Sequence, residues 1–270
     1  MHENSLWLGR MRAPVKTAMM VFIGLTLALY VWLIAQQFIH DDAYGMFEMI
    51  RPAGRPLVLA MLIIFSLALL FASLFLSDTK GAIETPPDGF FDIVSVVLGR
   101  LSMIMTAFIV LVMFYEVVSR YVFSKPTLWA NELSLWIAAF VFLLSGLYAM
   151  QQRSHIRIYV IYDMMPRWAQ KLSDCISVLL IVGFAVALVW GGYTDAENRF
   201  MRMETFGTAW DPPIPGIVKP GLLIIIVMVA IQAVSNLIAD WNKDPVEHSS
   251  SDDIDEIEIE NIRRTLEEQK

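Results

Sequence analysis

Six long runs of mainly apolar residues follow one another along the chain, with short polar segments between them. A helix that crosses the hydrocarbon core of a bilayer needs about 20 mainly apolar residues. The runs that meet this length are residues 17–39, 57–76, 93–118, 133–150, 172–193 and 217–239. The first run ends in Gln36, Gln37 and Phe38 instead of a small-residue cleavage site, so we expect it to be retained. The pattern predicts an all-α integral membrane protein with about six transmembrane helices.

The composition supports a membrane protein. The chain is 57% hydrophobic and 17% charged, whereas soluble domains average about 45–50% apolar and about 25% charged residues. Much of the net charge of -7 comes from the last twenty or so residues and describes a tail. No basic stripe is present, so we expect no nucleic-acid partner.

Residues 78–92, with Pro86, Pro87 and Gly89, form the best internal boundary. We expect a cytoplasmic N-terminal segment (1–16), a two-helix N-terminal extension with its linker (17–92), a four-helix core (93–242) and an acidic cytoplasmic tail (243–270). Residues 155–171 alternate polar and apolar positions, which predicts an amphipathic element along the cytoplasmic surface. The tail is either a docking helix for a partner or a solvated segment.

Basic residues near the span ends indicate the orientation. One cluster precedes the first span and another lies between the fourth and fifth spans: Arg10, Arg12 and Lys16, then Arg153, Arg157, Arg167 and Lys171. Both clusters should be cytoplasmic, which places both termini in the cytoplasm. Arg199, Arg202 and Lys219 oppose this orientation, because they follow the fifth span on the other side.

Residues suited to catalysis or cofactor binding are missing from the middle of the spans. His2, His40, His155 and His248 all lie outside mid-span positions, which argues against haem. No cluster of Cys, His and carboxylate residues suits zinc, and no nucleophile has a histidine at a suitable depth. Mid-span positions are apolar almost throughout, unlike those of a self-sufficient transporter. We therefore expect no catalytic residue, no metal ligand and no cofactor.

Polar residues near two span ends allow two interpretations. Glu116 and Arg120 lie one helical turn apart, and Trp129 and Glu132 open the fourth span. Anchoring at the membrane interface and helix capping would explain them. Alternatively, Arg120 and Glu132 brace the loop between the two spans as a docking surface for another protein.

A family pattern emerges from the order of several short motifs. Residues 119–132 read Ser-Arg-Tyr-Val-Phe-Ser-Lys-Pro-Thr-Leu-Trp-Ala-Asn-Glu, and Ser145-Gly146 and Arg153-Ser-His155 follow. Residues 208–215 read Thr-Ala-Trp-Asp-Pro-Pro-Ile-Pro, and Lys219-Pro-Gly comes next. Over about residues 93–241 the chain resembles the small permease (DctQ-like) subunits of tripartite ATP-independent periplasmic (TRAP) transporters. The two N-terminal helices and the acidic tail depart from the family pattern.

The resemblance implies a division of labour in a bacterial inner membrane. A periplasmic, DctP-like binding protein would capture an organic acid, and a large, DctM-like membrane subunit would carry it with sodium. The small subunit would scaffold the large one in the lipid bilayer and help to dock the binding protein, so sodium coupling would lie on the partner. The structural or docking candidates are Glu116, Arg120, Trp129, Glu132, Arg153, His155, Arg199, Arg202, Trp210 and Lys219.

Two other functions stay open from the sequence. The chain could be a stand-alone small membrane transporter or channel, which the shortage of mid-span charge disfavours. It could also be the membrane anchor subunit of another complex. In neither case does the sequence identify a substrate.

Overall fold

The computed structural model describes residues 5–40, 43–79, 84–153, 162 and 164–242, and in this part of the chain all regular elements are helical. A short 3-10 helix, Gly9–Met11, precedes the first long helix. The α-helices are α1 (Arg12–Ile39), α2 (Met46–Met49), α3 (Pro56–Ser77), α4 (Phe90–Tyr121), α5 (Ala130–Gln151), α7 (Arg167–Met201) and α8 (Ile214–Asp240). Among the described residues six helices are long and apolar enough to cross a membrane, which confirms the predicted all-α membrane fold.

The start of each long helix follows local sequence signals. Proline is favoured in the first helical turn, because that turn has no use for its missing N–H. Pro56 is the first residue of α3, and it follows a turn at Gly54, whose φ of 76° favours glycine. Gly89 and Pro166 are the extended residues directly before α4 and α7. Trp168 and Lys171, which we assigned to an amphipathic element, therefore belong to the first turns of α7, and residues 155–161 and 163 of that element lie outside the described residues.

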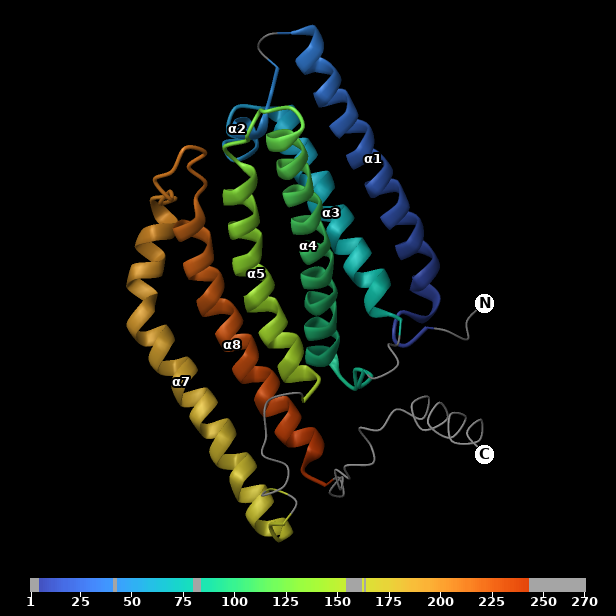
Figure 1. The fold of residues 1–270 in the computed structure, drawn as a ribbon. Coiled ribbons are helices and arrows are strands. Elements are labelled where there is room, and N and C mark those ends of the chain that lie inside the picture. The colour runs from blue at the N-terminus through green and yellow to red at the C-terminus, as the bar shows by residue number, and fades with distance from the viewer. Residues whose placement is uncertain (1–4, 41–42, 80–83, 154–161, 163, 243–270) are drawn as a thin grey trace, which may run out of the picture.

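The long helices form one bundle in which neighbours touch in the order α1, α3, α4, α5, α8 and α7 (Figure 1). Successive neighbours run antiparallel, except α5 and α8, which run in the same direction. Helix α4 also contacts α8, so α4, α5 and α8 form a three-helix centre. Helices α1 and α7 lie at the two edges. The N-terminal pair α1–α3 reaches the centre through the contact of α3 with α4.

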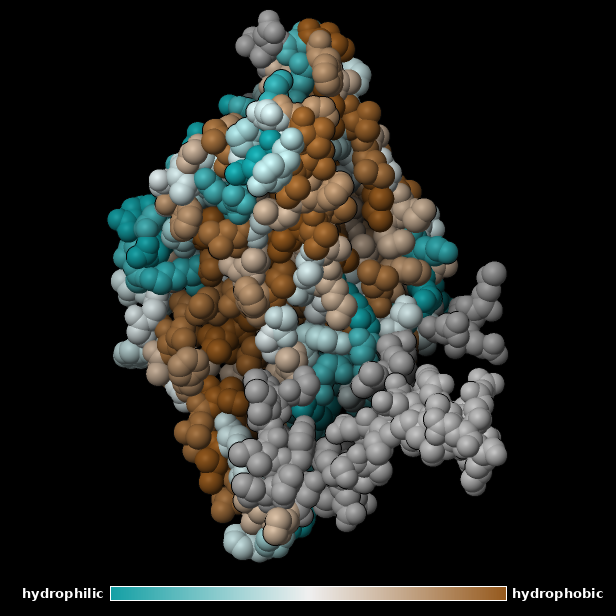
Figure 2. Space-filling view, in the orientation of Figure 1, coloured by the Kyte–Doolittle hydropathy of each residue, from teal (hydrophilic) through white to brown (hydrophobic). Residues whose placement is uncertain are grey.

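The outer surface of the array is largely apolar. Figure 2 shows hydrophobic side chains over much of the visible face. Large apolar side chains on these helices are exposed, among them Val110, Phe142, Leu179 and Trp190. Soluble monomers rarely expose apolar patches of this extent, so a bilayer must cover this surface. The chain is a multi-pass membrane protein.

A buried polar cluster joins the three central helices near one end of the bundle. The amide nitrogen of Gln232 on α8 donates to Asp92 on α4 at 2.6 Å and to Asn236 at 2.9 Å. The Gln232 oxygen accepts from the hydroxyl of Ser95 at 2.8 Å. Asn236 donates to the carbonyl of Met150 on α5 at 2.7 Å. Three of these hydrogen bonds join different helices, and the fourth holds Gln232 and Asn236 together on α8. The cluster therefore fixes how α4, α5 and α8 lie against one another.

Helices α4 and α5 approach closely at Gly99. A Cβ atom at this position would lie 2.5 Å from Cδ2 and 2.9 Å from Cβ of Tyr148. The Tyr148 hydroxyl donates to Glu84 at 2.6 Å, in the segment that leads from α3 to α4. The missing side chain of Gly99 therefore allows the contact that places Tyr148 against this connecting segment.

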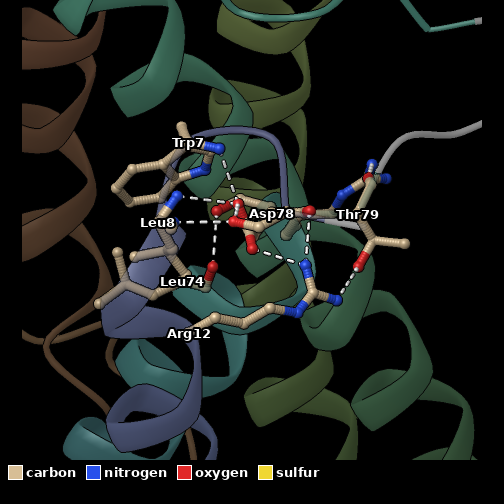
Figure 3. A network of polar contacts seen from close by, with 10 residues as sticks. Trp7, Leu8, Arg12, Leu74, Asp78 and Thr79 are labelled. Carbon is tan, nitrogen blue, oxygen red and sulfur yellow. Dashed lines mark hydrogen bonds and ion pairs between the residues drawn. The ribbon is translucent and has the colours of Figure 1, made fainter. Parts of the chain in front are cut away.

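Asp78, at the end of α3, holds the N-terminal segment (Figure 3). One carboxylate oxygen accepts from the backbone N–H groups of Trp7 at 2.8 Å and Leu8 at 2.9 Å, and from the Ser5 hydroxyl at 3.0 Å. The other pairs with Arg12 at 2.5 Å. Burial by itself raises the pKa of Asp78, but the hydrogen bonds from Leu8, Trp7, Ser5 and Arg12 outweigh it and hold the pKa below its ordinary value.

Substitution Gly99→Ala should force α4 and α5 apart and lower the free energy of unfolding by about 1–3 kcal/mol. Gly146→Ala is the matched control, because nothing lies within 4 Å of a Cβ there and alanine is the better helix former. Unfolding by sodium dodecyl sulfate in mixed micelles, followed by circular dichroism, measures both. Equal stability of the two variants would contradict the close contact.

Substitution Asp78→Asn should destabilise the protein at pH 7 by about 1.5–3 kcal/mol, the range for a hydrogen-bonded charged group. The folded pKa is depressed, so the stabilisation is complete above the ordinary pKa of about 3.9 and is lost as the pH falls through the folded value. The difference between wild type and variant should therefore shrink below pH 4. Thermal unfolding in detergent at pH 7 and pH 3.5 measures it, with Glu197→Gln, at an exposed carboxylate, as control. A difference that grows on acidification would refute this account.

Candidate docking surface

Three connections lie at the end of the bundle opposite the described chain ends, here called the distal face (Figure 1). Their described residues are 40 and 43–55, 122–129 and 202–213, between α1 and α3, α4 and α5, and α7 and α8. Eight of the ten candidate residues belong to this face or to the helix turns next to it. Arg153 lies at the other end, and His155 lies outside the described residues.

At the α4–α5 corner, one buried carboxylate joins the helix end to the loop. Glu116 accepts from the Nε of Arg120 at 2.9 Å, and its second oxygen accepts from the backbone N–H of Thr127 at 2.9 Å. The Thr127 hydroxyl donates to the same oxygen. Glu116 therefore holds both the last turn of α4 and the connection 122–129, while the Arg120 side chain stays partly exposed.

The start of α5 is fixed by an aromatic contact. The ring of Trp129 stacks on Tyr115 of α4, with centroids 5.7 Å apart and planes 26° apart. Glu132 lies in the first turn of α5, where a carboxylate complements the helix dipole. One of its oxygens is buried and has no hydrogen-bond partner among the described residues. The carboxylate that pairs with Arg120 is thus Glu116 and not Glu132.

At the α7–α8 corner, Asp195 is the centre of an ion-pair network. It accepts from the Nε of Arg199 at 3.1 and 3.2 Å and pairs with Lys219 of α8. Arg199 also pairs with Glu204 in the connection. Two of the predicted cations therefore hold this corner together. Arg202 differs, because its nearest carboxylate, on Glu204, lies 3.7 Å away and its side chain is 72% exposed.

The backbone of the connection 202–213 is folded tightly against α8. A Cβ at Gly216 would lie 2.9 Å from the backbone nitrogen of Glu204, so the close approach depends on this glycine. The backbone N–H of Gly216 donates to the backbone carbonyl of Glu204 at 3.2 Å, and the backbone N–H of Phe206 donates to the carbonyl of Pro212 at 3.0 Å. These bonds give the connection a defined shape.

Trp210 links this connection to the N-terminal pair of helices. Its side chain is only 1% exposed, and its indole N–H donates to the carbonyl of Met46 in α2 at 2.9 Å. Asp211 forms a second link, 3.7 Å from Arg51. Residues 43–55 and 202–213 are therefore in direct contact, although about 160 residues separate them in sequence.

Arg153 serves the opposite end of the bundle. Its guanidinium pairs with Asp240 through Nε at 2.5 Å and Nη2 at 3.0 Å. Because Arg153 lies just after the end of α5 at Gln151 and Asp240 is the last residue of α8, this bidentate pair ties the two helix ends together.

The described residues offer little for catalysis. They contain no group of three or more His, Cys, Asp or Glu side chains that could hold a metal ion. A hollow of about 780 Å³ forms a mainly apolar groove between α7 and α8. Val186, Trp190, Val227 and Ile231 are among its lining residues. Polar side chains in the lining are few, namely Tyr193, Thr194 and Ser235, so such a surface suits lipid or another apolar helix.

Several residues that organise these contacts were not predicted from the sequence. Asp195 carries a readable signal, because it lies four residues before Arg199 on one helix face. The Asp78 carboxylate accepts from a backbone N–H group, and Thr127 donates its own backbone N–H to Glu116. Met46 accepts from Trp210 through its backbone carbonyl. Backbone partners leave no trace in side-chain patterns.

Comparison with known proteins locates the chain in a family. The family model for the DctQ component of tripartite ATP-independent periplasmic transporters matches residues 109–243. The C4-dicarboxylate TRAP transporter small permease protein DctQ of Vibrio cholerae serotype O1 is 26% identical over 109 residues, which is 40% of this chain and 47% of that protein. The sialic acid TRAP transporter small permease protein SiaQ of the same organism is 29% identical over 100 residues, 36% of this chain and 56% of SiaQ.

The chain thus spans about half the length of the curated relatives that it matches. The matched residues run from the middle of α4 to the end of α8 and include the corners built around Glu116 and Asp195. Helices α1 and α3 lie outside them. The protein belongs to the DctQ family of TRAP transporter small permeases, which are transport components and not enzymes.

Proposed function

We propose that this chain scaffolds the large, DctM-like subunit of a TRAP transporter and helps to dock a periplasmic, DctP-like binding protein. The transporter takes up an organic acid with sodium, and the sodium and substrate sites lie on the partners. One observation carries the proposal: the polar side chains around Gln232 hydrogen-bond to one another and to the backbone, and in this way they link three helices. These groups therefore serve the packing of the bundle and are not directed at a substrate. A bundle of this kind supports a moving partner without binding cargo.

The exposed apolar helix faces supply the surface that a scaffold needs. Helices α1 and α7 each pack on one long neighbour and leave large side chains such as Trp32 and Trp190 exposed. A transport domain that moves through the bilayer requires a static counterpart held by lipid and by broad apolar contact. Apolar helices in lipid associate largely through van der Waals packing of complementary surfaces.

The distal face supplies the docking surface in this proposal. With both termini in the cytoplasm of a bacterial inner membrane, this face lies in the periplasm. Arg202 is its most exposed ion-paired cation, so we assign it to direct contact with the binding protein. Arg199 and Lys219 hold the corner through Asp195.

The scaffold role predicts that the chain co-purifies with a large membrane protein and that uptake is lost without it. Vesicles that contain the large subunit, the binding protein and this chain should accumulate an organic acid on a sodium gradient. Vesicles with this chain alone should accumulate none. Flux through the chain alone, as a stand-alone transporter or channel would show, refutes the proposal, and so does uptake in its absence.

The docking role predicts different effects for two neighbouring arginines. Arg202→Glu should raise the half-saturating concentration of binding protein for uptake by roughly two- to ten-fold, because the charge of an interface rim changes association. Arg199→Glu places a third carboxylate beside Asp195 and Glu204 and should lower the yield of folded complex. Arg10→Glu, at an exposed cation near the N-terminus, is the control for Arg202. An unchanged concentration dependence in Arg202→Glu removes the support for docking.

A further inference from the structure

We propose that residues 43–55, between α1 and α3, form part of the docking surface for the same binding protein. This inference rests on the proposed function and extends it to helices outside the residues matched by the family model. Residues 43–55 and 202–213 are together called the distal platform. The added N-terminal helices then have a role in partner recognition as well as in the bilayer.

The two halves of the distal platform form one surface. The buried Trp210 side chain bonds to the backbone of α2, and Arg51 pairs with Asp211. Pro212 and Ile214, beside Trp210 in sequence, are buried as well. A partner that touches the connection 202–213 therefore meets residues 43–55 at its edge.

The charges of the platform are arranged asymmetrically. Arg51 is 59% exposed and its partner Asp211 is 29% exposed, whereas Arg202 is 72% exposed and Glu204 is 34% exposed. Both pairs are 3.7 Å apart, and exposed pairs of this kind contribute little energy. The third carboxylate, Glu48, accepts from the N–H of Gly45 at 2.6 Å and is half-buried. The platform carries three arginines and three carboxylates, but Arg51 and Arg202 are more exposed than their paired carboxylates. The guanidinium groups at its surface suit an acidic patch on a soluble protein.

Apolar side chains lie beside these arginines. Phe47 is exposed on one half of the platform, and Met203 and Phe206 are exposed on the other. Aromatic, Met and Arg side chains are the types enriched at protein–protein interfaces. Their combination on one contiguous surface favours a protein partner.

Residues 43–55 are also held in shape before any partner binds. Gln37 donates to the carbonyl of Tyr44 at 3.2 Å, and the Arg55 guanidinium lies 5.9 Å from the centre of the Tyr44 ring. Arg55 also donates to the carbonyl of Arg51 at 3.0 Å. A surface that is ordered in advance loses less conformational entropy on docking.

The first test compares Arg51→Glu with Arg202→Glu and with the control Arg10→Glu. The large subunit and each variant are reconstituted in vesicles, and uptake is measured against the concentration of the binding protein that supports wild-type uptake. Arg51→Glu should raise the half-saturating concentration by roughly two- to ten-fold, without loss of complex yield. If Arg202→Glu shifts it and Arg51→Glu matches the control, the inference is wrong and the proposed function stands. If neither shifts it, the docking function itself fails.

The second test asks what Phe47 touches. Benzoylphenylalanine replaces Phe47 in the full complex, and Phe90, an exposed residue at the opposite end of the bundle, in a control. Illumination with the binding protein present should give an adduct of the combined mass of the two proteins at position 47 and not at position 90. An adduct with lipid alone at position 47 would show that the connection rests on the membrane, and it would overturn the inference.

Discussion

The need to satisfy polar groups inside hydrocarbon governs this structure. A bilayer core offers no water, so an unpaired backbone or side-chain group costs several kcal/mol there. Helices pair their backbone N–H and C=O groups internally. Polar side chains inside the bilayer must find partners of their own. Here Gln232 gathers Asp92, Ser95 and Asn236 into one cluster. Arg100, inside α4, pairs with Glu84. The same contacts that satisfy these groups also set the positions of the central helices.

Hydrogen bonds and ion pairs join the N-terminal helices α1 and α3 to the rest of the bundle at both of its ends. At one end, Glu84 accepts from Tyr148 and pairs with Arg100, which ties the linker after α3 to α4 and α5. At the distal face, Trp210 and Asp211 contact Met46 and Arg51. In between, α3 packs on α4 through apolar side chains. An added pair of helices fixed at both ends is part of the same bundle rather than a loosely attached anchor.

Residue patterns were sufficient for the features that depend on single segments. Each span follows from about 20 apolar residues, and the pairing of Glu116 with Arg120 follows from their spacing of four on one helix. Contacts across the bundle could not be read in this way. Asp78 bonds to N–H groups about 70 residues earlier, and Trp210 bonds to a carbonyl, so neither partner has a side-chain signature. The fourfold division of the chain and the roles of His155 and the acidic tail stay predictions.

The charged side chains at the distal face fall into two groups: those that pair tightly within the protein, and exposed arginines that could contact a partner. Asp195 engages Arg199 and Lys219, and Glu116 engages Arg120, so much of the charge at these corners is internal to the protein. Arg51 and Arg202 are held more loosely, because each lies 3.7 Å from its paired carboxylate, and Arg202 has one further hydrogen bond, from Nε to the carbonyl of Asn198 at 3.2 Å. Reorienting such a side chain toward a partner costs little, whereas reorienting Arg199 would leave two carboxylates close together. A rigid frame with a few weakly held arginines is therefore suited to a partner that must bind and leave in each transport cycle.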